Sequence, residues 1–462
     1  MVASAPLSWL ARYRIPIGLF AVGFAVLAAV AGSRLLHQSP DPHFIYQADA
    51  WLHGELAIRG PVKGDDWAKV ETVVLDDGRT VRGRRLSDRR TFRIAGGGTV
   101  SVDHIRETRG STYYVSFPPF PALLLLPQAA IGGRQGNDVL PTVVLAALCL
   151  PLAFACLRRL AQAGFSARSE RDDVMLVAVL AFGSVFFFSA VQGKVWYTAH
   201  VVGVALALIY AWASIEARHP VIAGLALGCA AVTRTPMAFM FPLFVLEAWR
   251  MAGPVGPDRR AFARSVARRL IPFAAPVIVI AAIAVAYNLV RFGEPTEFGH
   301  TYLDVRQQAQ IERYGLFNYH YLARNLAVAF TLLPELPGKS PWVQISGHGL
   351  AMWVTTPLVW LLLWPRERNA MHRALWITVA CVAVPTLFYQ NSGWVQFGYR
   401  FSLDYLAFLI LLLAVGARPF GWGTRALVAI AIAINLFGAI TFDRMWQFYR
   451  VGGDAYDVIV RH

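Results

Sequence analysis

The chain has 462 residues, of which 56% are hydrophobic and only 15% are charged. A soluble protein of this size carries more charge, so the composition indicates a polytopic membrane protein. The formal net charge of +15 would suit a nucleic-acid partner, but the charges lie in short segments between apolar runs, so we expect no such partner. The four cysteines all lie inside apolar runs and lack the spacing of a metal site.

Eleven apolar runs are long enough, or nearly so with their flanking residues, to cross a membrane. The first follows two arginines and is longer than the hydrophobic part of a signal peptide, so we expect an uncleaved first helix. The pattern predicts an all-α polytopic membrane protein that forms a single transmembrane domain. The runs are residues 15–36, 139–157, 174–191, 201–217, 221–232, 237–249, 270–290, 350–364, 374–388, 403–415 and 426–440.

A group of carboxylates follows the first apolar run, in the segment PDPHFIYQADAWLHGEL at residues 40–56. Asp41 stands between two prolines, and the second of them keeps Asp41 in an extended conformation. From His43 onward, apolar residues recur at helical spacing, which predicts a short helix along the membrane surface. Two interpretations of Asp41 remain open at this point: it caps this helix, or it supplies a reactive carboxylate.

Residues 70–115 have the alternating pattern of β-strands, with Asp77-Gly78 as a hairpin turn. We therefore expect a small β insert of undefined role on the membrane surface. Its many arginines predict a solvated face, and the alternative is contact with anionic head groups or glycan.

The arginine-rich short loops all fall on one side of the membrane if the N-terminus is cytoplasmic, as the positive-inside rule requires. This topology requires that residues 118–131, an apolar segment interrupted by four prolines, do not cross the membrane. It places two long segments, residues 37–138 and 291–349, on the outer face.

The same topology brings ionisable and aromatic residues from distant parts of the sequence to the outer face. Such residues at membrane depth are functional candidates, because burying them without a partner is costly. Structural alternatives exist: Arg400 and Asp404 are four residues apart and can pair with each other, and Lys194 can be an interfacial anchor. The other candidates are Asp49, Glu55, Trp196, Tyr197, His200, Arg234, Glu297, His300, Tyr302, Asp304, Tyr319, His320 and Tyr399.

The sequence lacks a Gly-rich phosphate loop, a His-Glu-x-x-His zinc motif, a Gly-x-Ser-x-Gly elbow and a Cys-x-x-Cys pair. A carboxylate opposed by cations at head-group depth suits transfer of a group from a lipid phosphate. The carboxylate would take a proton from an acceptor hydroxyl, and the cations would hold the phosphate that leaves.

Four segments resemble the GT-C superfamily of membrane glycosyltransferases, which use polyprenyl-phosphate-linked sugars. The resemblance is to the branch related to protein mannosyltransferases and lipid A aminoarabinose transferases. The segments are DPHFIYQADAWLHGEL (41–56), YYVSFPPFPALLLLP (113–127), IAGLALGCAAVTRTPMAFMFPLFVLEA (222–248) and FGYRFSLDYLAFLI (397–410).

The resemblance implies a bacterial cytoplasmic-membrane enzyme that transfers a sugar, with inversion, from polyprenyl phosphate to an acceptor hydroxyl on the outer face. It implies that Asp41 is the general base. Pro42 stands where the superfamily often has a second acidic residue, which leaves Asp49 as a rival or partner of Asp41. The resemblance also implies that Arg234 and Arg400 contact the donor phosphate.

We add Lys194 and His300 as further candidates for the donor phosphate. The expected substrate-binding residues are His43, Tyr46, Tyr302, Tyr399 and His200. We expect no cofactor and no obligatory metal, although a divalent cation stays open. The expected partners are a polyprenyl-phosphate-linked sugar, a glycan, lipid or protein acceptor, and membrane lipids. Two other functions remain as alternatives: a transporter of lipid-linked glycan, and a non-catalytic protein of envelope assembly.

Overall fold

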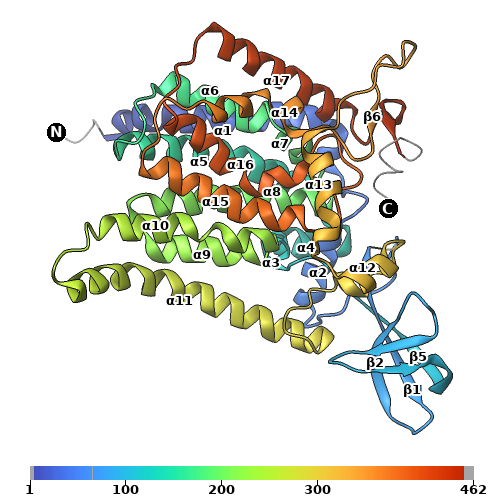
Figure 1. Cartoon of the computed structure of the whole chain (residues 1–462). Coiled ribbons are helices and arrows are strands. Elements are labelled where there is room, and N and C mark those ends of the chain that lie inside the picture. The colour runs from blue at the N-terminus through green and yellow to red at the C-terminus, as the bar shows by residue number, and fades with distance from the viewer. Residues whose placement is uncertain (1–4, 65, 452–462) are drawn as a thin grey trace.

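The computed structural model describes residues 5–64 and 66–451 of the chain. Helices pack side by side into a bundle, and a small sheet lies at one end of it (Figure 1). Six helices in the described residues are long and apolar enough to cross a membrane, so the chain is a multi-pass membrane protein. They are α1 (Ala5–Ala31), α5 (Val139–Gln162), α8 (Val195–Ser214), α11 (Arg259–Phe292), α15 (Ala370–Leu387) and α17 (Trp422–Thr441).

The remaining five apolar runs form shorter helices, so the count of eleven spans is not confirmed. The run at 174–191, for example, divides after Phe182, where Gly183 ends the first helix. The shorter elements are α6 (Glu170–Phe182), α7 (Phe186–Ala190), α9 (Pro220–Ala231), α10 (Pro242–Met251), α14 (Met352–Thr355), the 3-10 helix η8 (Pro357–Leu363) and α16 (Leu403–Val415).

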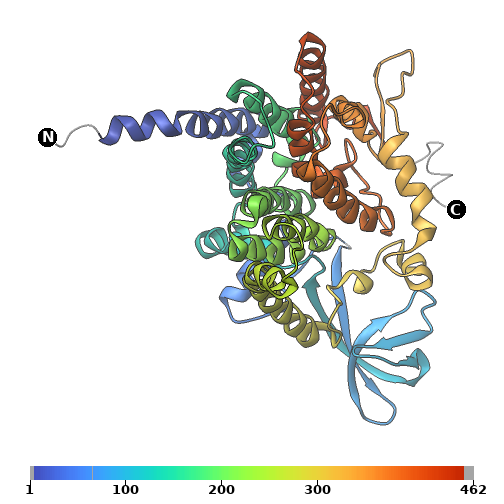
Figure 2. The ribbon, with the colours of Figure 1, turned by 60° about the vertical axis from the view of Figure 1, so that its left-hand side comes forward.

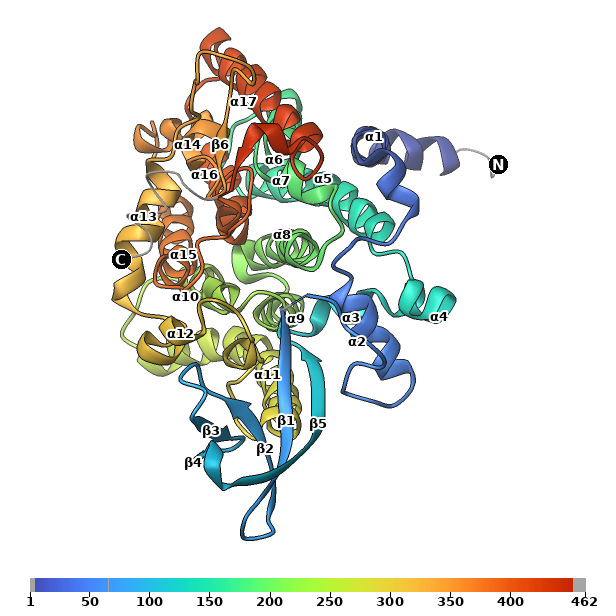
Figure 3. The same ribbon diagram turned by 90° about the vertical axis from the view of Figure 1, so that its right-hand side faces the viewer.

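The centre of the bundle is formed by α8 and α16, which are packed by protein on almost all sides. Every residue of α16 is buried, and α8 lies in the middle of the end-on view in Figure 3. By contrast, α1 and α11 expose most of their apolar side chains, and α1 extends away from the other helices in Figure 2. Apolar side chains on such peripheral helices are satisfied by lipid, because lipid tails are as apolar as the protein core.

Two glycines of α9 allow α11 to approach it closely. A Cβ atom at Gly224 would lie 2.0 Å from the carbonyl oxygen of Phe273, and one at Gly228 would lie 2.7 Å from Ile280 Cδ1. Small residues at a helix–helix contact let the two backbones come together in a membrane. This pair of helices forms one wall of the candidate site described below.

The predicted β insert is confirmed as a five-stranded antiparallel sheet with strand order β4-β3-β2-β1-β5. The first hairpin turns at Asp77-Gly78, where Gly78 has a φ of +86°. The strands are β1 (Trp67–Leu75), β2 (Thr80–Arg85), β3 (Thr91–Ile94), β4 (Thr99–Ser101) and β5 (Ile105–Val115). The sheet therefore begins three residues earlier than expected.

The sheet contacts the second long segment of the chain. Ala68 of β1 forms a bridge with Leu303, and the buried Arg84 pairs with Glu312 at 2.6 Å. The arginines of the insert are therefore not all on a solvated face. Around this end lie α2 (His43–Leu52), α3 (Phe120–Leu124), α4 (Leu126–Gly132), α12 (Gln308–Tyr314), α13 (Leu322–Phe330), β6 (Ile345–Ser346) and β7 (Tyr449–Arg450) (Figures 1 and 3).

Residues 37–138 and 291–349 thus meet at one end of the bundle, which the topology assigns to the outer face. The proline-rich segment forms α3 and α4, and neither helix is a candidate span. The side of the membrane on which this end lies stays a prediction.

Candidate active site

A cavity of about 510 Å³ lies at the end of the bundle that carries the sheet. One wall is apolar and comes from α9 and α11, with Gly228, Ala231, Val277, Ile280, Ala281 and Ala284 among its residues. The opposite part of the lining is polar and aromatic. It includes Asp66, Trp196, Arg234, Glu297, His300, Tyr389, Trp394 and Arg400.

Arg234 follows α9 and reaches the cavity from the turn that leads to α10. Its guanidinium holds Asp404 in a two-pronged ion pair, with Nε and Nη2 each 2.9 Å from a carboxylate oxygen. His200 Nδ1 lies 3.2 Å from the same carboxylate. Asp404 is 1% exposed, so this ion pair is buried, and its three members come from three separate parts of the chain.

Arg400 lines the cavity without a carboxylate partner. In the described part of the chain, no carboxylate lies within 4 Å of its guanidinium, so the alternative in which Arg400 pairs with Asp404 is wrong. Its Nη1 donates to the carbonyl oxygens of Gly393 and Val395, while the buried Nε has no partner among the described residues. Arg400 is therefore a buried cation at the cavity wall whose charge no carboxylate of the described residues balances at close range.

The Asp404 carboxylate offers a direct test of this polar core. We expect that Asp404→Ala lowers the free energy of unfolding by about 3–5 kcal/mol, because it leaves the charge of Arg234 half-buried and unpaired. Thermal unfolding of the purified protein in detergent measures the loss. The control is Glu335→Ala, which removes a half-exposed pair with Arg450 that is even shorter, at 2.6 Å, and should change stability little. Equal losses of stability in the two variants would contradict the view that the buried Asp404–Arg234 pair stabilises the fold more than an exposed pair does.

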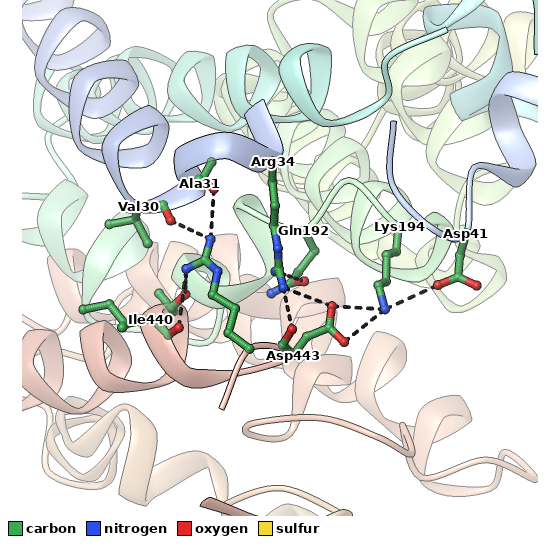
Figure 4. Close-up of polar contacts among 10 residues, drawn as sticks. Val30, Ala31, Arg34, Asp41, Gln192, Lys194, Ile440 and Asp443 are labelled. Carbon is green, nitrogen blue, oxygen red and sulfur yellow. Dashed lines mark hydrogen bonds and ion pairs between the residues drawn. The ribbon is translucent and has the colours of Figure 1, made fainter. Parts of the chain in front are cut away.

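Asp41 lies in a separate cluster beside the cavity, and its side chain is 30% exposed. Lys194 Nζ lies 3.4 Å from its carboxylate, and the amide of Val195 donates to its carbonyl oxygen at 3.1 Å. Figure 4 shows that Lys194 also reaches Asp443, which follows α17. Asp41 does not line the cavity, but Trp196, two residues after Lys194, does.

Asp49 is buried in α2 and does not line the cavity. His53 Nδ1 lies 3.8 Å from its carboxylate, and the guanidinium of Arg59 lies 4.0 Å from it. His43, on the same helix, stacks on the Trp67 ring with 3.9 Å between ring centroids. Burial lowers the pKa of His43 to about 4, so its imidazole is neutral at neutral pH.

His300 lines the cavity, but burial, together with the charge of Arg234, lowers its pKa to about 4. It would therefore meet a phosphate as a neutral hydrogen-bond donor and not as a cation. The four remaining predicted substrate-binding residues lie outside the lining. Tyr46 stacks on Arg134, Tyr302 packs on Phe292, Tyr399 is buried beside Thr386, and His200 holds Asp404.

Asp66 lines the cavity, although the sequence analysis did not single it out. Its Oδ2 accepts a hydrogen bond from Trp196 Nε1 at 2.9 Å. The available signal was a pair of adjacent carboxylates, Asp65-Asp66, just before the first strand. Of the predicted site residues, the structure therefore places Arg234, His300 and Arg400 in one cavity, and Asp41 and Lys194 together beside it. The expected absence of an obligatory metal stays a prediction.

No family model matches the chain, and a search of curated proteins finds no match. Solved structures of an archaeal oligosaccharyltransferase from Archaeoglobus fulgidus do match, with 98% of this chain covered. The apo form has a TM-score of 0.42 and 12% identity, and the AglB complex with an inhibitory peptide and a dolichol-phosphate has 0.43 and 13%. The chain spans 58% of their length.

Proposed function

We propose that the chain is a GT-C-type membrane glycosyltransferase. It transfers a sugar from a polyprenyl phosphate to an acceptor hydroxyl, outside the cytoplasmic membrane of a bacterium. The observation that carries the proposal is a single cavity that joins an apolar helical wall to the buried guanidinium of Arg400 and the partly buried one of Arg234. A donor with a hydrocarbon chain and a phosphate matches both parts.

The apolar wall would hold the first units of the lipid chain. It is formed by α9 and by α11, which exposes Ile278, Ile283 and other apolar side chains toward lipid on its far side. A lipid tail held against this wall would lie next to a helix that is itself at the edge of the bundle.

The donor phosphate would lie against Arg400, with Arg234 and the neutral His300 nearby. Arginine binds phosphate well, because its planar donors match two phosphate oxygens at once. The charge of Arg234 is largely balanced by Asp404, so Arg400 is the stronger anion site. This geometry favours binding of the negative charge that develops on the leaving phosphate.

The proposed reaction is a single displacement at the anomeric carbon. The acceptor O–H gives its proton to the carboxylate of Asp41, and the oxygen forms a bond to the anomeric carbon. The bond from that carbon to the phosphate oxygen breaks, and its electron pair leaves with polyprenyl phosphate. Attack opposite the leaving group inverts the anomeric configuration.

Asp41 is proposed as the base because it is partly exposed, is paired with a single lysine, and takes the position of the base in the resemblance. The acceptor would then enter from the side of Asp41, past Trp196. Asp66 is the second carboxylate at this place, and the hydrogen bond from the Trp196 indole suits a role in shaping the acceptor path.

The function can be tested with purified protein in lipid nanodiscs. A panel of polyprenyl-phosphate sugars is offered with candidate acceptors, and mass spectrometry follows release of polyprenyl phosphate and formation of glycosylated product. Acceptor-dependent release from at least one donor is expected, and an Arg400→Gln protein is the negative control. Absence of cleavage across the panel would contradict the proposal. Movement of intact donor across vesicle membranes without cleavage would favour a transporter instead.

A further inference from the structure

Residues from both ends of the chain meet at Asp41. Arg34 lies just after α1, Lys194 lies just before α8, and Asp443 lies just after α17 (Figure 4). Lys194 Nζ is 3.4 Å from Asp41 Oδ2 and 3.2 Å from Asp443 Oδ2. Arg34 Nη2 is 3.3 Å from Asp443 Oδ2 and also donates to the Asp443 carbonyl oxygen. The result is a line of alternating charges: Asp41, Lys194, Asp443, Arg34.

We propose that Asp443 is a positioning residue for the transfer reaction: by sharing Lys194, it prevents this lysine from neutralising Asp41 completely. The inference rests on the proposed function, in which Asp41 accepts the proton of the acceptor hydroxyl. A carboxylate that has a lysine to itself holds its negative charge firmly and is a weak base. A carboxylate that shares its lysine with a second acid has a higher proton affinity.

Asp443 also stabilises the site after Asp41 has accepted the proton of the acceptor hydroxyl. When Asp41 becomes neutral, the ammonium of Lys194 loses one of its two counter-charges. Asp443 remains at 3.2 Å and keeps the buried ammonium paired, since the Lys194 side chain is only 16% exposed. The cost of leaving a cation unpaired in a poorly solvated place is therefore avoided.

Other charged or titratable groups face Asp41 from the neighbouring elements. Asp138, which precedes α5, accepts hydrogen bonds from the amide and hydroxyl of Ser39. Burial raises the pKa of Asp138 to about 6, and the charge of Asp41 adds to this rise. Tyr197 lies in the first turn of α8, close enough to Asp41, Asp443 and Arg400 to interact with their charges. These groups are unchanged in the variants below.

The turn that presents Asp443 is held by a separate set of bonds. Arg444 donates to the carbonyl oxygens of Val30 and Ala31 on α1, and to those of Ala439 and Ile440 on α17. Asp443 itself has a left-handed backbone, with φ +59°, which Asn adopts as readily as Asp. Asp443→Asn therefore removes the charge with little change of shape or backbone, and the Arg444 contacts can be perturbed independently.

The test is the pH dependence of kcat/KM for sugar transfer by the full-length protein in nanodiscs. Loss of activity at acidic pH reports protonation of the base. With Asp443→Asn, Lys194 pairs with Asp41 alone, so we expect this acidic limb to move to lower pH by about 0.5–1 unit, with a lower maximal rate. With Arg34→Gln, Asp443 is left unbalanced, so the limb should move in the opposite direction, to higher pH.

Two further variants separate charge from structure. Arg444→Lys keeps the positive charge but loses the four-carbonyl contact, so the melting temperature should fall while the acidic limb stays in place. Asp443→Glu restores the charge and should return the limb toward its original position. General loosening of the turn cannot produce shifts of opposite sign.

The inference is overturned if the limb stays fixed in both Asp443→Asn and Arg34→Gln, or if Arg444→Lys moves it equally. Should Asp443→Asn fail to fold, the shift in Arg34→Gln and the absence of one in Arg444→Lys still decide the question. Failure of the proposed function looks different, because the unaltered protein would then show no transfer at any pH.

Discussion

Replacement of Asp41 by asparagine is expected to lower sugar-transfer turnover by about 10²–10⁴-fold, the usual contribution of a general base. The amide keeps the size of the side chain but cannot accept the acceptor proton. Donor binding should stay nearly unchanged, because the cavity lining does not include Asp41. Turnover is measured with labelled donor in nanodiscs, and donor affinity is measured separately by equilibrium binding.

Two matched variants decide which carboxylate is the base. Asp49→Asn should retain most activity, because Asp49 is buried in α2 beside His53 and Arg59. Asp66→Asn should cause a smaller loss than Asp41→Asn, since its proposed role is to shape the acceptor path. A full-size loss in Asp66→Asn combined with normal turnover in Asp41→Asn would transfer the role of base to Asp66, a carboxylate that lines the cavity.

The second large effect is expected from Arg400→Gln. Hydrogen bonds to charged groups contribute about 1.5–3 kcal/mol each, so loss of the guanidinium should weaken donor binding roughly 10–100-fold. Turnover should fall further, by about 10²–10³-fold, because the charge on the leaving phosphate grows during the reaction. Binding of a polyprenyl-phosphate sugar and single-turnover rates measure the two effects separately.

Arg324→Gln is the matched control for this variant. Arg324 also donates to backbone carbonyls, those of Tyr389 and Gln390, but it does not line the cavity. It should therefore lose stability without losing donor affinity. Unchanged donor binding in Arg400→Gln would show that the arginine serves only to hold the loop that contains Gly393 and Val395.

The fold class and several local elements follow from the sequence. Long apolar runs become helices that can span a membrane, because length and hydropathy are properties of each segment alone. The same holds for the hairpin at Asp77-Gly78 and for the short helix that starts at His43, since turn chemistry and helical periodicity act over a few residues. Shorter apolar runs were ambiguous, because a membrane span and a buried half-length helix have the same composition.

The candidate site shows where local reasoning stops. The four-residue spacing of Arg400 and Asp404 allowed a pair on one helix, but Arg400 lies in a 3-10 turn before α16 begins at Leu403. Asp404 therefore pairs with Arg234, 170 residues away in the chain. Asp66 gave only a weak signal, since a pair of acids before a strand normally lies in solvent.

Hydropathy and turn residues are enough to identify a multi-pass helical membrane protein with a β insert and with charged residues grouped near one end. Which charges are partners follows from the packing of the helices, which leaves Arg400 at the cavity and brings Asp443 to Lys194. The reason is physical: hydropathy and turn preferences are local, whereas the partner of a buried charge depends on which helices pack together. In the row of alternating charges that runs from Asp41 to Arg34, helix packing brings together residues from both ends of the chain.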